Sequence, residues 1–274
     1  MEDSLLQNDD KFLATGLEIP SRAESFVLQN LFADPAFARF YAENRQRISM
    51  PVYWWWQQPS RSGYSCCQPR SPNHGYIIYL PHIPAKRSDA FGVAHELGHI
   101  LLGLEGYPHV TGNGFSAPTA TLLSSMFTDL VINRRLMEAY GFEIPFDGEE
   151  HLRKSIRNTK GKPLPTHPLL YAELLFEHLA HFMGYEVVKG DGARPPAYAW
   201  SARRFPSLIR EFEELRVVLR EVGWETPQQQ EQLLQFLIER YHLALFGLRV
   251  ITGKPVQKRR PVRSKKKSER SPTA

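Results

Sequence analysis

The segment His95–His99 brings two histidines and a glutamate together, in the order His-Glu-Leu-Gly-His. On a helix, side chains four residues apart project from one face about one turn apart, so His95 and His99 can bind a single metal ion. Glu96 lies about 100° around the helix from His95, close enough to reach a water on the metal without binding the metal. The spacing therefore predicts a zinc site with a carboxylate beside it.

This combination of groups suits the hydrolysis of a peptide bond. Zinc lowers the pKa of a bound water towards about 7. Glu96 can take the proton of that water as the hydroxide attacks a polarised carbonyl, and can then pass it to the leaving amine. We therefore expect a zinc-dependent peptidase with His95 and His99 as metal ligands and Glu96 as the general base.

The residues around the motif argue against a chance pair of surface histidines. The helix that carries it is apolar nearly all round, so it should be buried. A glutamate and two histidines in a buried helix are unfavourable unless they bind something. The alternative is a structural cluster that satisfies itself without a metal. The flanking apolar residues are Phe91, Val93, Ala94, Leu97, Ile100, Leu101 and Leu102.

A hydrolytic zinc site needs a third protein ligand and an open fourth position. Asp129 is the first candidate, because it lies in the middle of an apolar helix pattern, with Asn133 one turn further on the same face. There Asn133 could orient a ligand from behind. The alternative is that Asp129 is a surface charge paired with Arg134 or Arg135.

Glu105 is the second candidate for the third ligand. It follows His99 by six residues, the separation at which a ligand falls when the active-site helix ends in a sharp glycine turn. That turn needs glycine three residues after the second histidine, where this chain has Leu102, followed by Gly103. The shift favours Asp129 over Glu105.

Three features of residues 50–145 resemble the gluzincin-like zinc metallopeptidases of the ImmA/IrrE type: a strand at Tyr76–Leu80, the segment Ala94–Leu102 and the helix around Asp129. In that family the His-Glu-x-x-His helix follows a short sheet and precedes the helix that bears the third ligand. The family usually supplies Glu, whereas this helix offers Asp129 or, one turn earlier, Ser125. The resemblance implies a bacterial peptidase, associated with stress response or a mobile element, that cuts a specific regulatory protein.

The elements that must position these residues can be predicted from periodicity and from turn residues. β-branched and aromatic runs predict strands at Pro51–Trp56 and Tyr76–Leu80, with a loop between them that holds Cys66 and Cys67. Strand Tyr76–Leu80 is a candidate edge that could hold an extended peptide. Helices are expected over residues 21–46 with a break at Asp34-Pro35, then over 88–104, 116–140, 168–183, 205–222 and 227–247.

This layout predicts an α+β fold, with a small antiparallel or mixed sheet packed on the His-Glu-x-x-His helix and a mainly helical C-terminal half. Strands are expected only in the first third of the chain. The predicted organisation is a zincin-like metallopeptidase domain at 1–145, a helical region at 146–252 packed on it, and a disordered basic tail at 253–274.

Charge is distributed unevenly along the chain. The net charge is +5, but residues 254–274 hold nine Lys or Arg and one Glu, so this tail carries +8 and the rest carries −3. The tail's charge suits a weak, salt-sensitive contact with nucleic acid or an acidic partner, and a plain solubilising end is the alternative. A rival to the peptidase is a non-catalytic zinc-binding scaffold that engages a protein or nucleic acid, but such a module would not need Glu96.

A cytoplasmic protein is expected, with a protein or peptide substrate and no membrane contact. No apolar run reaches about 18 residues, and the N-terminus is acidic where a secretory signal would be basic. The adjacent Cys66 and Cys67 suit reduced thiols better than a disulfide. His178 and His181 are expected to be core or surface histidines rather than a second metal site. Tyr107 could donate to an oxyanion, although packing is its expected role.

Overall fold

The computed structural model describes residues 21–56, 65–67, 75–82, 84, 87–144 and 164–252. This part is mainly helical with two small sheets, which is compatible with an α+β fold. Its α-helices are α2 (Ser21–Leu28), α3 (Pro35–Asn44), α4 (Arg87–Glu105), α5 (Ala117–Arg135), α7 (Pro168–Lys189), α8 (Pro196–Arg204), α9 (Pro206–Val222) and α10 (Pro227–Arg240). Its strands are β1 (Val52–Trp56), β2 (Ser65–Cys67), β3 (Tyr76–Leu80), β4 (His109–Thr111) and β5 (Arg249–Ile251).

The first sheet is mixed, with the strand order β1–β3–β2. β1 runs parallel to β3, with Val52 beside Tyr76, and β2 runs antiparallel to it, with Cys67 beside Ile77. Two predictions were wrong here. β3 is the central strand, so it offers no free edge to a peptide, and Cys66 and Cys67 lie in strand β2 rather than in a loop.

The second sheet pairs β4 with β5, and it shows that strands are not confined to the first third of the chain. Val110 lies opposite Val250 in this antiparallel pair. The backbone N–H of Val110 also donates to the Ser124 hydroxyl at 2.8 Å, and that hydroxyl donates to the Val110 carbonyl at 3.1 Å. β4 is thus held between the C-terminal strand and helix α5.

The predicted break between the first two helices is confirmed, and its cause is local. Asp34 caps α3, because its Oδ1 accepts hydrogen bonds from the backbone N–H groups of Ala36 at 2.8 Å and Phe37 at 3.2 Å. Pro35 occupies the first position of the helix, where its missing N–H is not needed. Asp34 therefore starts α3, which the helical turn η1 (Leu31–Ala33) separates from the end of α2.

The C-terminal half contains four helices among its described residues. α7 begins at Pro168 as expected but continues to Lys189, and α8 was not predicted. Thr226 and Gln229 form the capping box that starts α10. That helix ends at Arg240, short of the predicted residue 247, and a helical turn η5 (Leu243–Phe246) follows. The break coincides with His242, whose φ of 54° is left-handed.

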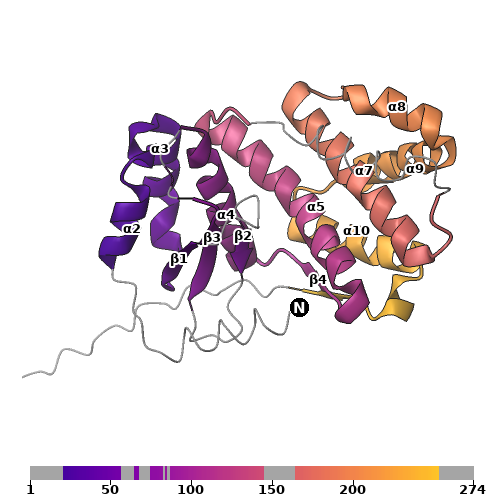
Figure 1. Ribbon diagram of the computed structural model, residues 1–274, viewed down its shortest axis with the longest axis horizontal. Helices are drawn as coiled ribbons and strands as arrows, with labels where there is room; N and C mark the ends of the chain where they lie inside the picture. Colours follow the sequence, from indigo (N-terminus) through magenta and orange to yellow (C-terminus); the bar gives the residue numbers. More distant parts are fainter. Residues whose placement is uncertain are drawn as a thin grey trace, which may run out of the picture.

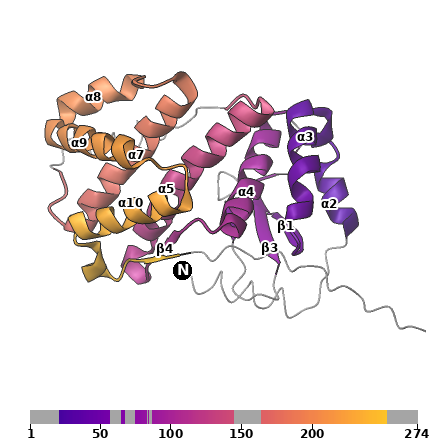
Figure 2. The same cartoon turned by 180° about the vertical axis from the view of Figure 1, so that it is seen from behind.

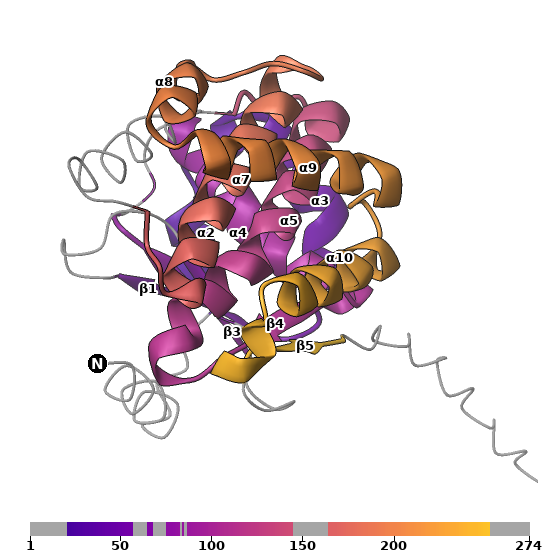
Figure 3. The same ribbon diagram turned by 90° about the vertical axis from the view of Figure 1, so that its right-hand side faces the viewer.

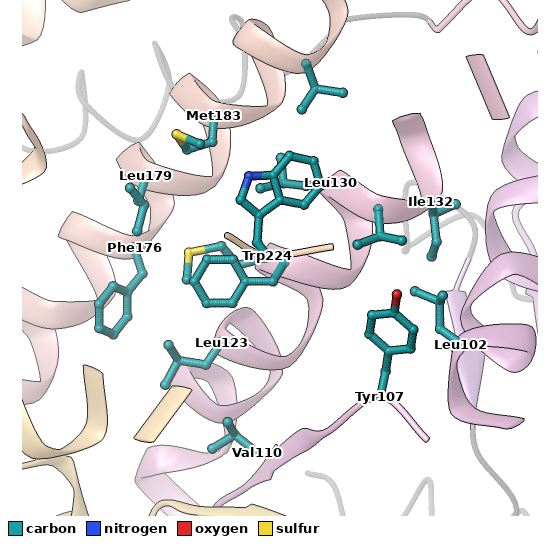
Figure 4. Packing of buried hydrophobic residues seen from close by; sticks show 14 of the residues in the cluster. Leu102, Tyr107, Val110, Leu123, Leu130, Ile132, Phe176, Leu179, Met183 and Trp224 are labelled. Carbon is teal, nitrogen blue, oxygen red and sulfur yellow. The ribbon is translucent and has the colours of Figure 1, made fainter. Parts of the chain in front are cut away.

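Helix α5 crosses the middle of the molecule, between the β1–β3–β2 sheet with α2 to α4 and the helices α7 to α10 (Figures 1 and 2). It packs against α7 on one side and contacts α4 on the other. One hydrophobic core joins both halves, as the labelled side chains of α4, α5, α7 and Trp224 show (Figure 4). The expected boundary near residue 145 lies outside the described residues, as does the basic tail.

In the view from the side of the C-terminal helices, α9 and α10 lie in front of α5 (Figure 3), but α7 is the one that packs extensively on α5, and α9 packs on α7 and α10. α5 continues through a π-helical turn, η4 (Leu136–Tyr140), and stops at Gly141, whose φ is 77°. The stretch Gly114–Tyr140 has the length and hydropathy to cross a membrane, but 56% of its most apolar window is buried in the protein. The core helix of a soluble protein has the same properties.

Candidate metal centre

The candidate centre lies where α4 faces α5. Most of α4 is buried, and the side chains of Val93, Ala94 and Leu97 belong to the core. His95 and His99 lie on the half-buried face of the same helix. Their rings are one turn apart, with centroids separated by 4.9 Å and planes inclined at 79°. The i, i+4 spacing thus places both imidazoles on the side of α4 that meets α5.

Asp129 completes a cluster with the two histidines. Its Oδ1 lies 3.4 Å from Nε2 of His95 and 3.2 Å from Nε2 of His99. One ligand atom from each of the three residues lies within 4.8 Å of the others. The same Oδ1 is buried and makes no hydrogen bond among the described residues. A buried carboxylate oxygen without a hydrogen bond is costly to the fold, so it needs a cation or a proton close by.

Asn133 fixes the orientation of the first imidazole. Nδ1 of His95 lies 3.0 Å from Oδ1 of Asn133, one turn after Asp129 on α5. If Nδ1 carries the hydrogen and donates to Asn133, the Nε2 lone pair is left facing Asp129 and His99. Asn133 therefore lies behind His95, a candidate ligand, where it can hold the imidazole in one orientation.

The charges in the cluster stabilise one another. Burial opposes the charged form of His95, but the neighbouring carboxylate of Asp129 outweighs burial and raises the pKa of His95 to about 9. Burial also opposes the charged form of Asp129, yet its contacts with both histidines hold the pKa of this carboxyl well below its usual range. Without a metal the cluster therefore holds protons, which a bound cation would displace.

Glu96 is buried beside this cluster, with 6% of its surface exposed. Burial raises the pKa of its carboxyl, while His95 and His99 pull that pKa down. Among the described residues, no hydrogen bond or ion pair engages the Glu96 carboxylate. A buried acid with a raised pKa and no fixed partner is free to exchange a proton with a molecule bound at the cluster.

Glu105, the second candidate for the third ligand, is used elsewhere. Its Oε1 accepts from Arg47 at 2.6 Å, and its Oε2 accepts from Arg135 at 2.7 Å. It therefore ties the end of α4 to α5 and to the segment before β1. The structure brings Asp129, not Glu105, to the two histidines. Asp129 is also not paired with Arg134 or Arg135, which bind Glu225 and Glu105.

Tyr107 and His178 make contacts that fit a structural role. The Tyr107 hydroxyl donates to the backbone carbonyl of Glu225 and accepts from Arg135 at 3.0 Å, so packing fits it better than an oxyanion role. Nδ1 of the fully buried His178 donates to the Leu174 carbonyl at 2.7 Å. His178 is a core histidine, as predicted, and neither it nor His181 belongs to the metal-binding group found among the described residues.

The donor set fits a zinc ion. Two imidazole nitrogens and one carboxylate oxygen are common zinc ligands, and bonds of about 2.0–2.1 Å in a tetrahedral arrangement separate neighbouring donors by about 3.3 Å. The two N–O separations measured here are 3.4 and 3.2 Å. Side-chain exposure of 38% at Asp129 leaves one side of the cluster accessible. Comparisons of the chain with protein-family models, curated proteins and solved structures gave no match.

Proposed function

We propose that this protein is a zinc-dependent peptidase in which His95, His99 and Asp129 hold the metal and Glu96 is the general base. One observation carries the proposal. Oδ1 of Asp129 is buried without a hydrogen bond and lies 3.4 and 3.2 Å from the Nε2 atoms of His95 and His99, the separation expected of neighbouring ligands around one zinc ion. The separate position of Glu96, next to the cluster but outside it, supports hydrolysis rather than a purely structural metal site.

When bound, zinc supplies Lewis acidity, which activates a water and polarises a carbonyl. The protein's own groups then move the protons. The Glu96 carboxylate accepts a proton from the attacking water and donates it to the amine that leaves. Asn133 keeps His95 oriented throughout, and the apolar residues of α4 shield the Glu96 carboxylate from bulk water.

The substrate is proposed from the resemblance to ImmA/IrrE-type peptidases. That resemblance points to a specific regulatory protein in the cytoplasm, in bacterial stress response or in the control of a mobile element. The basic tail at 253–274 stays a proposed contact for nucleic acid or an acidic partner, and it lies outside the described residues.

Metal analysis tests the ligand assignment. Purified wild type should bind one zinc ion per chain, and Asp129→Ala should lose it. Glu105→Ala is the matched control, because it removes a nearby carboxylate that already has two arginine partners. It should keep its zinc. Full zinc occupancy in Asp129→Ala would show that the third ligand is another residue.

Cleavage of a quenched fluorescent peptide library tests the mechanism. Glu96→Gln keeps the shape of the side chain but cannot act as a base, so it should keep zinc and lose activity by about 100-fold or more. Undiminished cleavage in Glu96→Gln would refute the assigned base. Zinc binding in wild type without cleavage of any peptide or of unfolded casein would favour the zinc-binding scaffold instead.

A further inference from the structure

Helices α4 and α5 lie close together at Gly98, a glycine inside the motif. A Cβ atom placed on Gly98 would lie 2.8 Å from Cγ2 and 3.1 Å from Cγ1 of Ile132. Both distances are shorter than the 3.5–4.0 Å at which carbon atoms normally pack. Ile132 is a buried core residue of α5 (Figure 4). No side chain larger than hydrogen fits at Gly98 while the two helices keep this separation.

The contact cannot be relieved by moving the end of a flexible side chain. Cγ1 and Cγ2 of Ile132 are bonded directly to its Cβ, and a β-branched residue on a helix has one strongly preferred rotamer. Their positions therefore follow the backbone of α5. An added carbon at Gly98 would push α5 away from α4 by about 1 Å, the difference between the distance of 2.8 Å and normal packing.

This contact is adjacent to the metal cluster on both helices. Gly98 precedes His99 directly, and Ile132 lies between Asp129 and Asn133. Aspartate is shorter than glutamate by one carbon–carbon bond of about 1.5 Å. Because metal–ligand distances tolerate deviations of only about 0.2 Å, Asp129 reaches the histidines only if the two helices are close together.

We propose that Gly98 is a positioning residue of the metal centre. By letting Ile132 approach the α4 backbone, it brings the short side chain of Asp129 close enough to His95 and His99 for all three to bind one metal ion. The inference rests on the proposed metal site. It assigns a role to the fourth residue of the motif and links that residue to the use of aspartate on α5.

Zinc affinity, measured by competition with a chromophoric chelator, tests this link. Gly98→Ala should weaken zinc binding at least tenfold, although alanine favours a helix more than glycine does. A second substitution, Ile132→Ala, removes the crowded atoms and should restore most of the affinity. Asp129→Glu should also restore it in the Gly98→Ala background, because the longer side chain spans the wider gap. In the wild-type background, Asp129→Glu should weaken binding.

General destabilisation cannot produce this reciprocal pattern. Ile132→Ala alone is the control, since it leaves a cavity in the core but keeps the close approach, and its zinc affinity should equal that of wild type. Equal affinity in Gly98→Ala and wild type would overturn the inference, as would a loss that neither second substitution reverses. If Gly98→Ala does not fold, Asp129→Glu alone decides, because wild-type affinity in that variant would show that helix separation is not limiting. Absence of zinc binding in wild type would instead refute the proposed function.

Discussion

Glu96 on α4 and Glu186 on α7 are both buried carboxylates, but they differ in their hydrogen-bond partners. Glu186 accepts hydrogen bonds from the backbone N–H of Gly192 at 3.0 Å, from Arg194 at 3.0 Å and from Arg216. These bonds tie the end of α7 to α9 and to the loop before α8. No hydrogen bond or ion pair from the described residues engages the Glu96 carboxylate.

The difference separates a structural cluster from a candidate functional one. Around Glu186 the donors and acceptors satisfy one another, so the cluster stabilises the contacts between helices. Around Glu96 and Asp129 one carboxylate has no partner and one buried oxygen has no hydrogen bond. A buried carboxylate oxygen without a hydrogen bond destabilises a fold, so its position beside two histidine nitrogens indicates a ligand.

A matched pair of substitutions should separate the two carboxylates by their effect on stability. Glu186→Gln removes the carboxylate that Arg194 and Arg216 share and leaves them only Glu213, so it should lower the free energy of unfolding by about 3 kcal/mol. Glu96→Gln removes a buried charge that lacks a partner and should change the unfolding free energy of the metal-free protein by less than about 0.5 kcal/mol. Urea denaturation of both variants measures this. A larger loss in Glu96→Gln than in Glu186→Gln would reverse the comparison.

The buried His178 of α7 should make the free energy of unfolding depend on pH. Burial lowers the pKa of His178 to about 4, so this side chain is neutral in the folded protein at neutral pH. The unfolded chain binds its proton at about pH 6.5. Stability is therefore fully present above pH 6.5 and is lost as the pH falls towards 4, by about 3 kcal/mol in total.

Denaturation between pH 7 and pH 4 measures that loss. His178→Phe removes the titrating group and should flatten this part of the profile, at the expense of the hydrogen bond to the Leu174 carbonyl. An unchanged slope in His178→Phe would show that other groups cause the acid sensitivity.

Zinc affinity should also depend on Asn133, the residue behind the imidazole of His95. Asn133→Ala removes the acceptor for Nδ1 of His95 and should weaken zinc binding 10- to 100-fold, the usual effect of losing such a partner. Asn133→Asp keeps an acceptor at the same place, so its affinity should stay within about tenfold of wild type. Chelator competition measures both. Equal affinities in Asn133→Ala and wild type would mean that Asn133 does not orient the ligand.

Part of the candidate centre could be predicted because its signals are local. The spacing of His95 and His99 requires only a helix, and a lone acid inside an apolar helix marked Asp129. The role of Gly98 could not be predicted, since its reason is contact with Ile132, more than thirty residues further along the chain. The ion pairs of Glu105 could not be predicted either, because one of its partners, Arg47, precedes it by 58 residues.

In the fold, too, features with a local sequence signal were predicted, and features that depend on contacts between distant residues were not. The starts of helices with clear caps were predicted close to the observed ones, as Thr226 shows for α10, whereas the predicted ends of α7 and α10 missed by six and seven residues. The strands β2, β4 and β5 have three residues each, too few to show an alternating pattern. β4 and β5 also pair across more than a hundred residues, a separation that no local sequence pattern reveals.

Tyr107 provides the smallest expected effect and tests the contact between the two regions. Its hydroxyl links the segment after α4 to Glu225 in the loop before α10 and to Arg135 on α5. Tyr107→Phe should lower the free energy of unfolding by about 1 kcal/mol, as expected for a part-buried hydrogen bond, and should leave zinc affinity and peptide cleavage unchanged.

Tyr140→Phe is the control for Tyr107→Phe, because its hydroxyl bridges Asn44 and Glu43 of α3 and makes no contact with the loop before α10. Similar stability losses with full activity in both variants would place Tyr107 with Glu186 among the structural groups. A fall in kcat in Tyr107→Phe alone, with zinc still bound, would place it with Glu96 as a group that acts on the substrate. The hydroxyl would then have to leave the Glu225 carbonyl when substrate binds, and the two regions would no longer be separate in function.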